Sequence, residues 1–147
     1  MRNVIIADTS CLIILFKIGE LDLLRQLYGK VFITREVAFE FKQLLPDWIE
    51  MIVDVDNQYQ VLLEMEIDKG EASSIALALK MEKATLILDV IKARKVADKL
   101  GLLYTGTLGV IVKSKLTGII DSVQPIIAKI KNTNFRFSDR LIEEALH

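Results

Sequence analysis

Four carboxylates stand where apolar segments of this chain end or where helices begin, and their placement points to chemistry. Asp8 directly follows the short apolar run 4–7, and Asp89 follows the similar run 85–88. Glu71 opens a strongly helical stretch, and Glu40 lies beside the apolar stripe of another helical segment. Because the carboxyl ends of parallel strands meet at one edge of a sheet, we expect Asp8 and Asp89 to share a pocket.

The types of residue available restrict the chemistry of such a pocket. His147 is the only histidine and Cys11 the only cysteine, which argues against a Ser-His-Asp or Cys-His nucleophile and rules out an internal disulfide. Neither the P-loop pattern nor the dinucleotide-binding glycine pattern occurs. A group of carboxylates with so few soft ligands favours Mg²⁺ or Mn²⁺ over zinc. Taken singly, each acid has a simpler explanation, such as Asp8 being a capping or turn residue.

The rest of the chain predicts the elements that would position these acids. Short strands are expected at 4–7, 31–33, 85–88 and 102–104, and 48–55 fits either a strand or a short helix. The alternation of short strands with helices predicts one α/β domain over residues 1–147, with a mostly parallel central sheet covered on both sides.

Helix signals divide the segments between these strands. Thr9 and Ser10 are the expected caps of a helix from about Cys11, and Thr34 caps one that runs to Pro46. A helix over 58–67 should pack through one apolar face, and Gly70 should break the chain before a helix from Glu71 to about Lys83. The packing face of the 58–67 helix is Val61, Leu62 and Met65, and the last helix should begin at Ser138.

Composition sets the expectations about partners and location. Hydrophobic residues make up 52% of the chain and the mean hydropathy is +0.36, which predicts extensive burial or an apolar interface such as that of a homodimer. The net charge of −1 gives no overall argument for nucleic-acid binding. The longest apolar run, 11–16, is too short to span a membrane, and no secretory signal is recognisable, so a cytoplasmic protein is expected.

Three motifs, in order and spacing, resemble those of a PIN-domain protein, most closely the branch related to VapC-type toxin ribonucleases. The first is Asp8-Thr9-Ser10-x-Leu12-Ile13, the second is Gly70-Glu71-Ala72, and the third is the segment 105–109, Thr-Gly-Thr-Leu-Gly. The resemblance extends over nearly the whole length. It implies a three-layer α/β/α domain in which clustered acids bind divalent metal and cleave RNA, with an antitoxin protein as a further partner.

The resemblance also implies roles for individual residues. Asp8, Glu71 and Asp89 match acids that bind Mg²⁺ or Mn²⁺, Glu40 matches a further catalytic acid, and Ser10 matches a supporting hydroxyl. Metal-assisted hydrolysis of RNA phosphodiester bonds needs no histidine.

Two further segments accompany these acids. Thr107, in the turn before a helix, is a supporting residue whose segment can present N–H groups to a phosphate, or simply form a tight turn. Lys92, Arg94 and Lys95, just beyond Asp89, are expected to contact RNA phosphates, with a solvated helix face as the simpler alternative.

One position departs from the family pattern and keeps rival functions open. Similar members often carry two adjacent acids where this chain has Asp89-Val90, so the second acid is missing. One rival is therefore a non-catalytic PIN-like module that binds RNA or protein through the same fold, with an impaired metal site. Another is a receiver-like phosphoacceptor in which Asp8 or Asp89 is phosphorylated, which leaves the second and third motifs unexplained.

Overall fold

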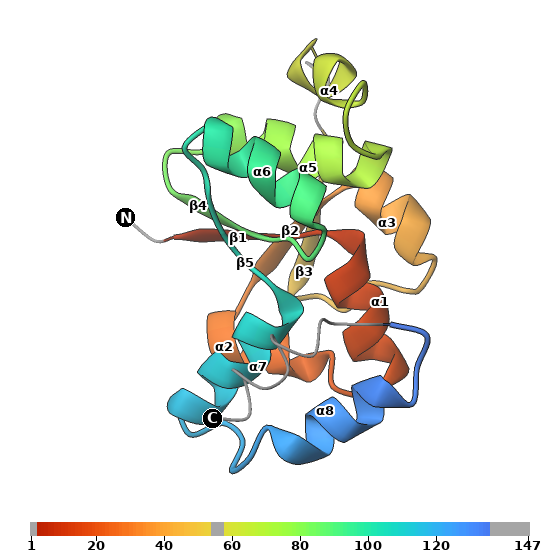
Figure 1. The fold of residues 1–147 in the computed structure, drawn as a ribbon, viewed down its shortest axis with the longest axis vertical. Helices are drawn as coiled ribbons and strands as arrows, with labels where there is room; N and C mark the ends of the chain where they lie inside the picture. Colours follow the sequence, from red (N-terminus) through yellow and green to blue (C-terminus); the bar gives the residue numbers. More distant parts are fainter. Residues whose placement is uncertain (1–2, 54–57, 136–147) are drawn as a thin grey trace.

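A five-stranded sheet forms the centre of the protein, and all of its strands are parallel. The computed structural model describes residues 3–53 and 58–135, and Figure 1 shows the chain path. The strand order is β3-β2-β1-β4-β5, which places β1 at the middle. The strands are β1 Val4–Ala7, β2 Val31–Thr34, β3 Ile49–Ile52, β4 Ala84–Ile87 and β5 Leu103–Thr105. The segment that fitted either a strand or a helix is thus the edge strand β3.

Helices connect the strands and cover both faces of the sheet, which confirms the predicted three-layer α/β/α domain. In the described ranges these are α1 Thr9–Lys17, α2 Asp22–Tyr28, α3 Arg35–Phe41, α4 Gln58–Leu63, α5 Lys69–Leu79, α6 Ile91–Lys99, α7 Thr107–Leu116 and α8 Gln124–Lys131. None of them is long and apolar enough to cross a membrane. The helix expected from Ser138 lies outside the described residues.

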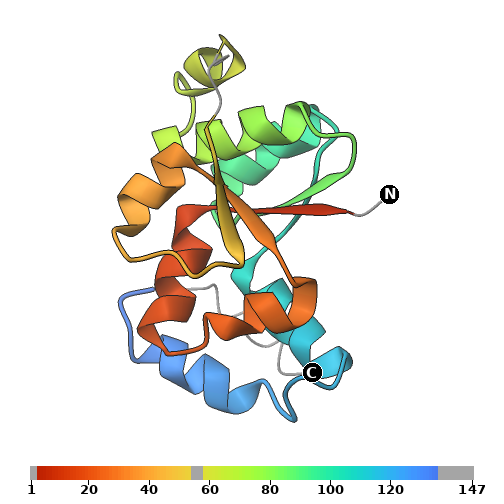
Figure 2. The same ribbon diagram turned by 180° about the vertical axis from the view of Figure 1, so that it is seen from behind.

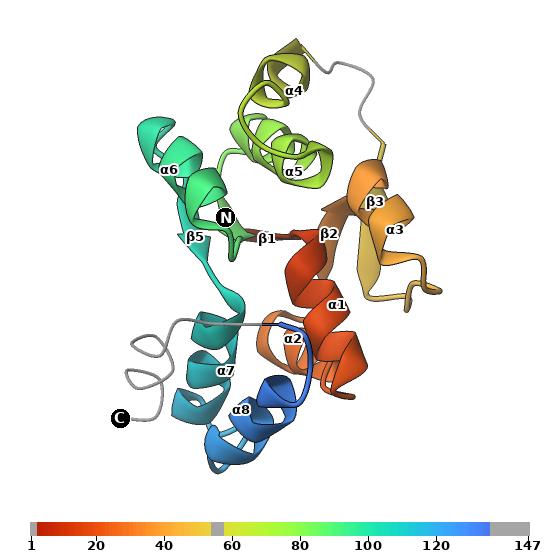
Figure 3. The same cartoon turned by 45° about the vertical axis from the view of Figure 1, so that its right-hand side comes forward.

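Alternation along the strands divides the core between the two faces. Ile5 and Ala7 of β1 belong to one hydrophobic cluster, whereas Ile6 between them belongs to the other, because successive strand side chains point to opposite faces. The larger cluster gathers α1, α2, α7 and α8 below the sheet, and the smaller one gathers α5 and α6 above it (Figure 3). Seen from behind, β3 and α3 lie at the side of the sheet away from β5 (Figure 2).

Helix α3 is shorter than its apolar spacing predicted. It ends at Phe41, and Lys42 adopts a left-handed conformation with φ 63°. The predicted extension to Pro46 is therefore wrong, and Leu44 is 97% exposed. The apolar spacing continues beyond the turn, but no element in the described ranges covers Leu44.

The predicted packing face of α4 is also wrong. Val61, Leu62 and Met65 are exposed, whereas Gln60 is buried. The Gln60 Nε2 donates to Glu36 Oε2 at 2.6 Å, so α4 approaches α3 through a polar contact. A helix of six residues that stands at the periphery (Figure 1) need not bury its apolar side.

Two helix starts differ from prediction in a way that bears on the acids. The N-cap of α1 is Asp8 itself, with extended φ −86° and ψ 170°, so Thr9 and Ser10 lie in the first turn instead of capping it. The N-cap of α5 is Asp68, so Gly70 lies inside the first turn and is no break. Helix α5 ends at Leu79, earlier than the predicted Lys83. An aspartate with an extended backbone directly before a helix occupies the N-cap position, so the residues after it belong to the first turn.

Candidate functional site

The carboxyl edge of the sheet brings the predicted acids into one region. Strands β1 and β4 pair in register, with Ala7 opposite Ile87, and the Asp8 N–H donates to the Ile87 carbonyl at 3.2 Å. Asp8 therefore leaves the sheet beside the end of β4, where Asp89 follows two residues later. The expectation that the two strand-end aspartates share an edge agrees with this register.

Asp8 is the least satisfied acid of the site. Its side chain is buried, with only 4% of the residue exposed, and its Oδ1 has no hydrogen-bond partner. Burial raises the pKa of Asp8 to about 8, and the charges of Glu71, Asp68 and Glu40 add to the rise, while a backbone hydrogen bond from Thr9 opposes it. A buried carboxylate with an unpartnered oxygen and negative neighbours is unstable as an anion unless a cation approaches.

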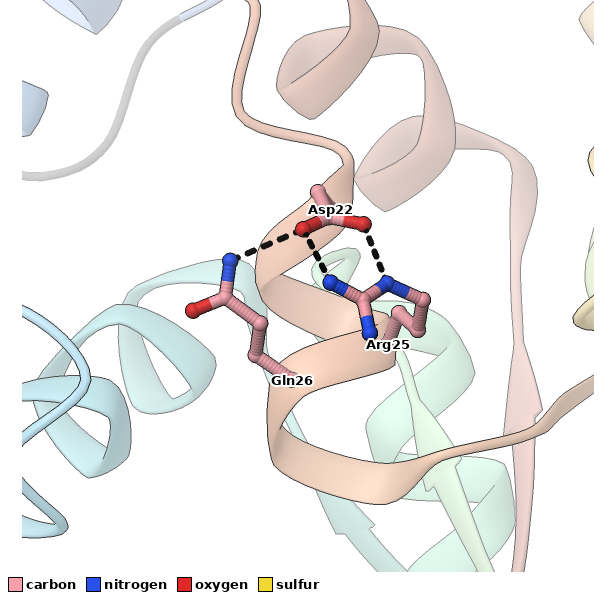
Figure 4. Close-up of polar contacts among 3 residues, drawn as sticks. All are labelled: Asp22, Arg25 and Gln26. Atoms are coloured by element: carbon pink, nitrogen blue, oxygen red, sulfur yellow. Dashed lines mark hydrogen bonds and ion pairs between the residues drawn. The ribbon is translucent and has the colours of Figure 1, made fainter.

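Asp22 shows the opposite situation on the surface of α2. Its two carboxylate oxygens accept from Arg25 at 2.6 and 2.8 Å, and Gln26 donates to one of them at 2.8 Å (Figure 4). These hydrogen bonds, first of all the one from Arg25, lower the pKa of Asp22 to about 2. The contrast with Asp8 follows from burial and partners, because the two residues have the same side chain.

Glu71 is positioned by a capping box at the start of α5. Its N–H donates to Asp68 Oδ1 at 2.9 Å, and its own Oε1 accepts from the Asp68 N–H at 3.2 Å. Burial raises the pKa of Glu71, and the neighbouring charge of Asp68 contributes. This reciprocal bonding fixes the direction of the Glu71 side chain.

Asp68 is an acid of this region that the sequence reasoning missed as a site residue. It contributes to the raised pKa of both Asp8 and Glu71. The signal that finds it is the spacing of a capping box, an aspartate three residues before a glutamate at the start of an apolar helix. That spacing places a second carboxylate beside Glu71.

Glu40 reaches the same region from α3. It is exposed, and its Oε1 accepts from the Thr9 Oγ1 at 2.7 Å. Gly70 makes this approach possible, because a Cβ at that position would collide with the Glu40 carboxylate and lie 3.1 Å from Thr9 Oγ1. The first turns of α1 and α5 and the side of α3 therefore meet around Glu40.

Asp89 differs from Asp8 in having partners for both oxygens. The Thr107 N–H donates to Oδ1 at 2.8 Å, and the Thr107 hydroxyl donates to Oδ2 at 2.6 Å. The Ser10 hydroxyl donates to Oδ2 at 3.4 Å, so the acid that this hydroxyl contacts is Asp89. Thr107 begins α7, and its N–H is directed at a carboxylate of the protein instead of being free for a phosphate.

The basic residues after Asp89 fall into two kinds. Lys92 and Lys95 are exposed on α6. Arg94 is partly buried, and its Nε donates to the Leu88 carbonyl at 2.7 Å. Val90, where a second acid is frequent in similar sequences, is 44% exposed at the N-cap of α6.

The donor set suits a hard divalent cation. Its oxygens come from carboxylates, and the orphaned Asp8 Oδ1 is a buried acceptor that a cation would satisfy. No group of three or more histidine, cysteine, aspartate or glutamate side chains in the described part of the chain is arranged closely enough to hold a metal ion as it stands. The sequence predicted Asp8, Glu71 and Asp89 as the residues that would hold such an ion, with Glu40 as a further acid.

Comparison with known proteins places this site in a family context. A family model described as a PIN domain matches residues 4–147. Searches of curated proteins and of solved structures gave no match. PIN domains are generally nucleases, and PIN nucleases generally use divalent metal ions. Because the match covers nearly the whole chain, the protein belongs to the PIN-domain family.

Proposed function

We propose that the protein is an endoribonuclease that hydrolyses RNA phosphodiester bonds and depends on Mg²⁺ or Mn²⁺. The observation that carries the proposal is the buried Asp8 Oδ1, which has no partner and faces the charges of three other acids. Such a carboxylate destabilises the folded protein when ionised, and a bound cation would remove that cost.

In this proposal Asp8, Glu71 and Asp89 hold the ion, and Glu40 is a further catalytic acid. When bound, a divalent ion supplies Lewis-acid activation of water and compensates the charge that develops on the phosphate. Thr107 and Ser10 keep Asp89 in a fixed direction through their hydrogen bonds. The capping box does the same for Glu71. The reaction adds water to phosphorus and breaks one P–O bond, with a proton going to the leaving sugar oxygen.

Lys92 and Lys95 are proposed to bind RNA phosphates beside the acids. Both are exposed on α6, whose N-terminus follows Asp89 directly. Lysine contacts of this kind position a nucleic acid without reading its sequence. Removing one lysine should therefore weaken RNA binding similarly for all sequences and reduce the salt dependence of binding.

One specific observation favours a second candidate, a non-catalytic module that binds RNA or protein. Both Asp89 oxygens are already engaged by Thr107 and Ser10, and Val90 supplies no carboxylate next to them. In this case the site would lack a ligand that an active nuclease needs. Val90→Asp would then create metal binding or cleavage that the natural chain lacks.

Cleavage of an end-labelled single-stranded RNA, with Mg²⁺ or Mn²⁺ added, separates the two candidates. The nuclease proposal expects cleavage by the natural chain, its loss with the metal chelator EDTA, and its loss in Asp8→Asn. Absence of cleavage together with absence of metal binding by calorimetry would favour the non-catalytic module. Cleavage by Val90→Asp but not by the natural chain would also favour the non-catalytic module.

The toxin role and the homodimer are finer parts of the proposal. The resemblance to toxin ribonucleases supports the first, and growth arrest on expression, absent in Asp8→Asn, is its test; an antitoxin partner should relieve that arrest. Exposed apolar side chains such as Phe39 and Leu44 support the second. Sedimentation of the purified chain measures the oligomeric state directly.

A further inference from the structure

Arg94 connects three segments that surround Asp89. Its Nε donates to the carbonyl of Leu88, the residue just before Asp89, at 2.7 Å. Its guanidinium carbon lies 5.2 Å from the ring centroid of Tyr104, which belongs to β5. Through these two contacts the Arg94 side chain links the residue that follows β4, and strand β5, to helix α6.

Gly106 brings the third segment against the same guanidinium. A Cβ at Gly106 would collide with Arg94 Nη2 and lie 3.0 Å from Asp89 Oδ1. The backbone of Gly106 is extended, with φ −123° and ψ −179°, a conformation that any residue adopts. The glycine is therefore needed for the close approach of Arg94 and Asp89, and not for its own conformation.

The ring that carries the guanidinium is itself held in place. The Tyr104 hydroxyl donates to Asp98 Oδ2 at 3.2 Å, and Asp98 lies four residues after Arg94 on α6. Arginine suits this setting because its guanidinium has a flat face for the ring and a directed Nε–H for the carbonyl. A lysine keeps the charge but offers neither feature.

We propose that Arg94 is a positioning residue for Asp89 and not a contact for RNA phosphate. Its Nε–H holds the Leu88 carbonyl, and its guanidinium lies close against Gly106. These two residues flank the place where Asp89 accepts from the N–H and hydroxyl of Thr107. The catalytic consequence of this role rests on the proposed nuclease function. The structural role of Arg94 does not rest on the nuclease function, so the structural role and its catalytic consequence are measured in separate experiments.

The first measurement follows the backbone amide of Thr107 by hydrogen exchange, because its N–H donates directly to Asp89 Oδ1. In Arg94→Lys we expect this amide to lose protection by roughly fivefold or more relative to core amides. Asp89→Ala should abolish the same protection and so validates the readout. Lys99→Gln, an exposed residue at the end of α6, is the control and should leave it unchanged.

The second measurement separates turnover from binding in RNA cleavage with Mn²⁺. Arg94→Lys should lower kcat by about tenfold or more and leave KM unchanged, because a misplaced ligand affects the reaction and not RNA binding. Tyr104→Leu should act in the same direction, and Tyr104→Phe, which keeps the ring, should have a smaller effect. A phosphate contact would behave differently, since lysine retains the charge and would preserve KM and kcat.

The outcomes separate this inference from the proposed function. Unchanged Thr107 protection in Arg94→Lys overturns the positioning role, even if the natural chain cleaves RNA. A raised KM in Arg94→Gln with unchanged protection of Thr107 overturns it in favour of a phosphate contact. If the natural chain cleaves no RNA, the nuclease proposal fails, while loss of Thr107 protection in Arg94→Lys still supports the positioning role.

Discussion

The two strand-end aspartates occupy neighbouring positions at one sheet edge, yet their surroundings are opposite. Asp89 has partners for both oxygens, two of them from Thr107. Asp8 is buried with Oδ1 unpartnered and has other acids around it. The difference indicates that the protein fixes the direction of Asp89 and leaves Asp8 Oδ1 without a partner, which in the proposed function a cation would supply.

The same contrast separates the groups that support each acid. On the Asp89 side, Thr107, Ser10 and the nearby Arg94 contribute donors or positive charge. On the Asp8 side, Glu40 and Glu71 contribute negative charge. In the proposed function, a divalent ion bound here would give the Asp8 carboxylate the positive partner that the protein itself does not provide.

The largest effect is expected from Asp8→Asn. It should reduce metal-dependent RNA cleavage by roughly 10²-fold or more, since it removes the charge that would hold the ion. End-labelled RNA assays measure this loss. Asp22→Asn, which alters an exposed carboxylate on α2, is the matched control and should leave cleavage unchanged. Equal loss in both variants would break the distinction between the two kinds of aspartate.

Stability should depend on pH in a way set by Asp8. Its pKa rises from an ordinary value of 3.8 to about 8 in the folded protein, so between those values the folded state binds more protons than the unfolded state. The free energy of unfolding should therefore fall as pH rises from about 4 through about 8.

Denaturant unfolding without metal, at several pH values, measures this slope. Asp8→Asn should remove it and be more stable than the natural chain by about 2 kcal/mol at pH 8. Mn²⁺ at a hundred times its Kd should stabilise the natural chain by about 2.7 kcal/mol. A natural chain whose stability rises over this pH range would contradict the assignment of a raised pKa to Asp8.

Gly70→Ala tests how closely Glu40 must approach Asp8. The new Cβ would collide with the flexible end of Glu40, so that side chain moves and its hydrogen bond with Thr9 is lost. Cleavage should fall by about tenfold, whereas stability should change by less than about 1 kcal/mol because alanine favours a helix. In the Glu40→Ala background the same substitution should have little further effect. Additive losses would show that Gly70 acts through another residue.

The smallest effect concerns the fixed acid. Thr107→Val removes the hydroxyl that donates to Asp89 Oδ2 but keeps the backbone N–H on Oδ1. We expect a loss of about 1 kcal/mol in unfolding free energy and a several-fold loss of cleavage. Thr107→Ser, which keeps the hydroxyl, should restore both. If valine and serine behave alike, the hydroxyl does not hold Asp89.

The α/β architecture could be predicted from the sequence because short apolar runs typical of buried strands alternate along the chain with segments of helical apolar spacing. Ile5, Ile6 and Ala7 form a run that suits a strand buried on both faces, and they divide between both clusters as that position requires. The sheet-edge position of Asp8 follows from this strand alone. The packing face of α4 was predicted wrongly because apolar spacing alone does not show whether another element covers it, and within residues 3–53 and 58–135 no element covers Leu62.

The partners within the site were harder to predict because they come from residues far apart in the chain. Ser10 lies two residues from Asp8 in sequence but bonds Asp89, since the first turn of α1 faces the end of β4. Arginine is a residue type that often contacts phosphate, so the sequence favoured that role for Arg94. Only the positions of Tyr104 and Gly106 in the structure show where its guanidinium lies. Periodicity carries no information on such contacts.

Calorimetric titration with Mn²⁺ at pH 7 tests the central claim most directly, namely that Asp8 is the acid that receives a divalent cation. Because the pKa of Asp8 is about 8, the metal-free carboxyl is mostly protonated at pH 7. Binding should therefore release close to one proton, seen as a dependence of the heat on the ionisation enthalpy of the buffer. The account predicts this release in the natural chain and no binding in Asp8→Asn. Equal Mn²⁺ binding by both proteins, or binding by neither, would contradict it.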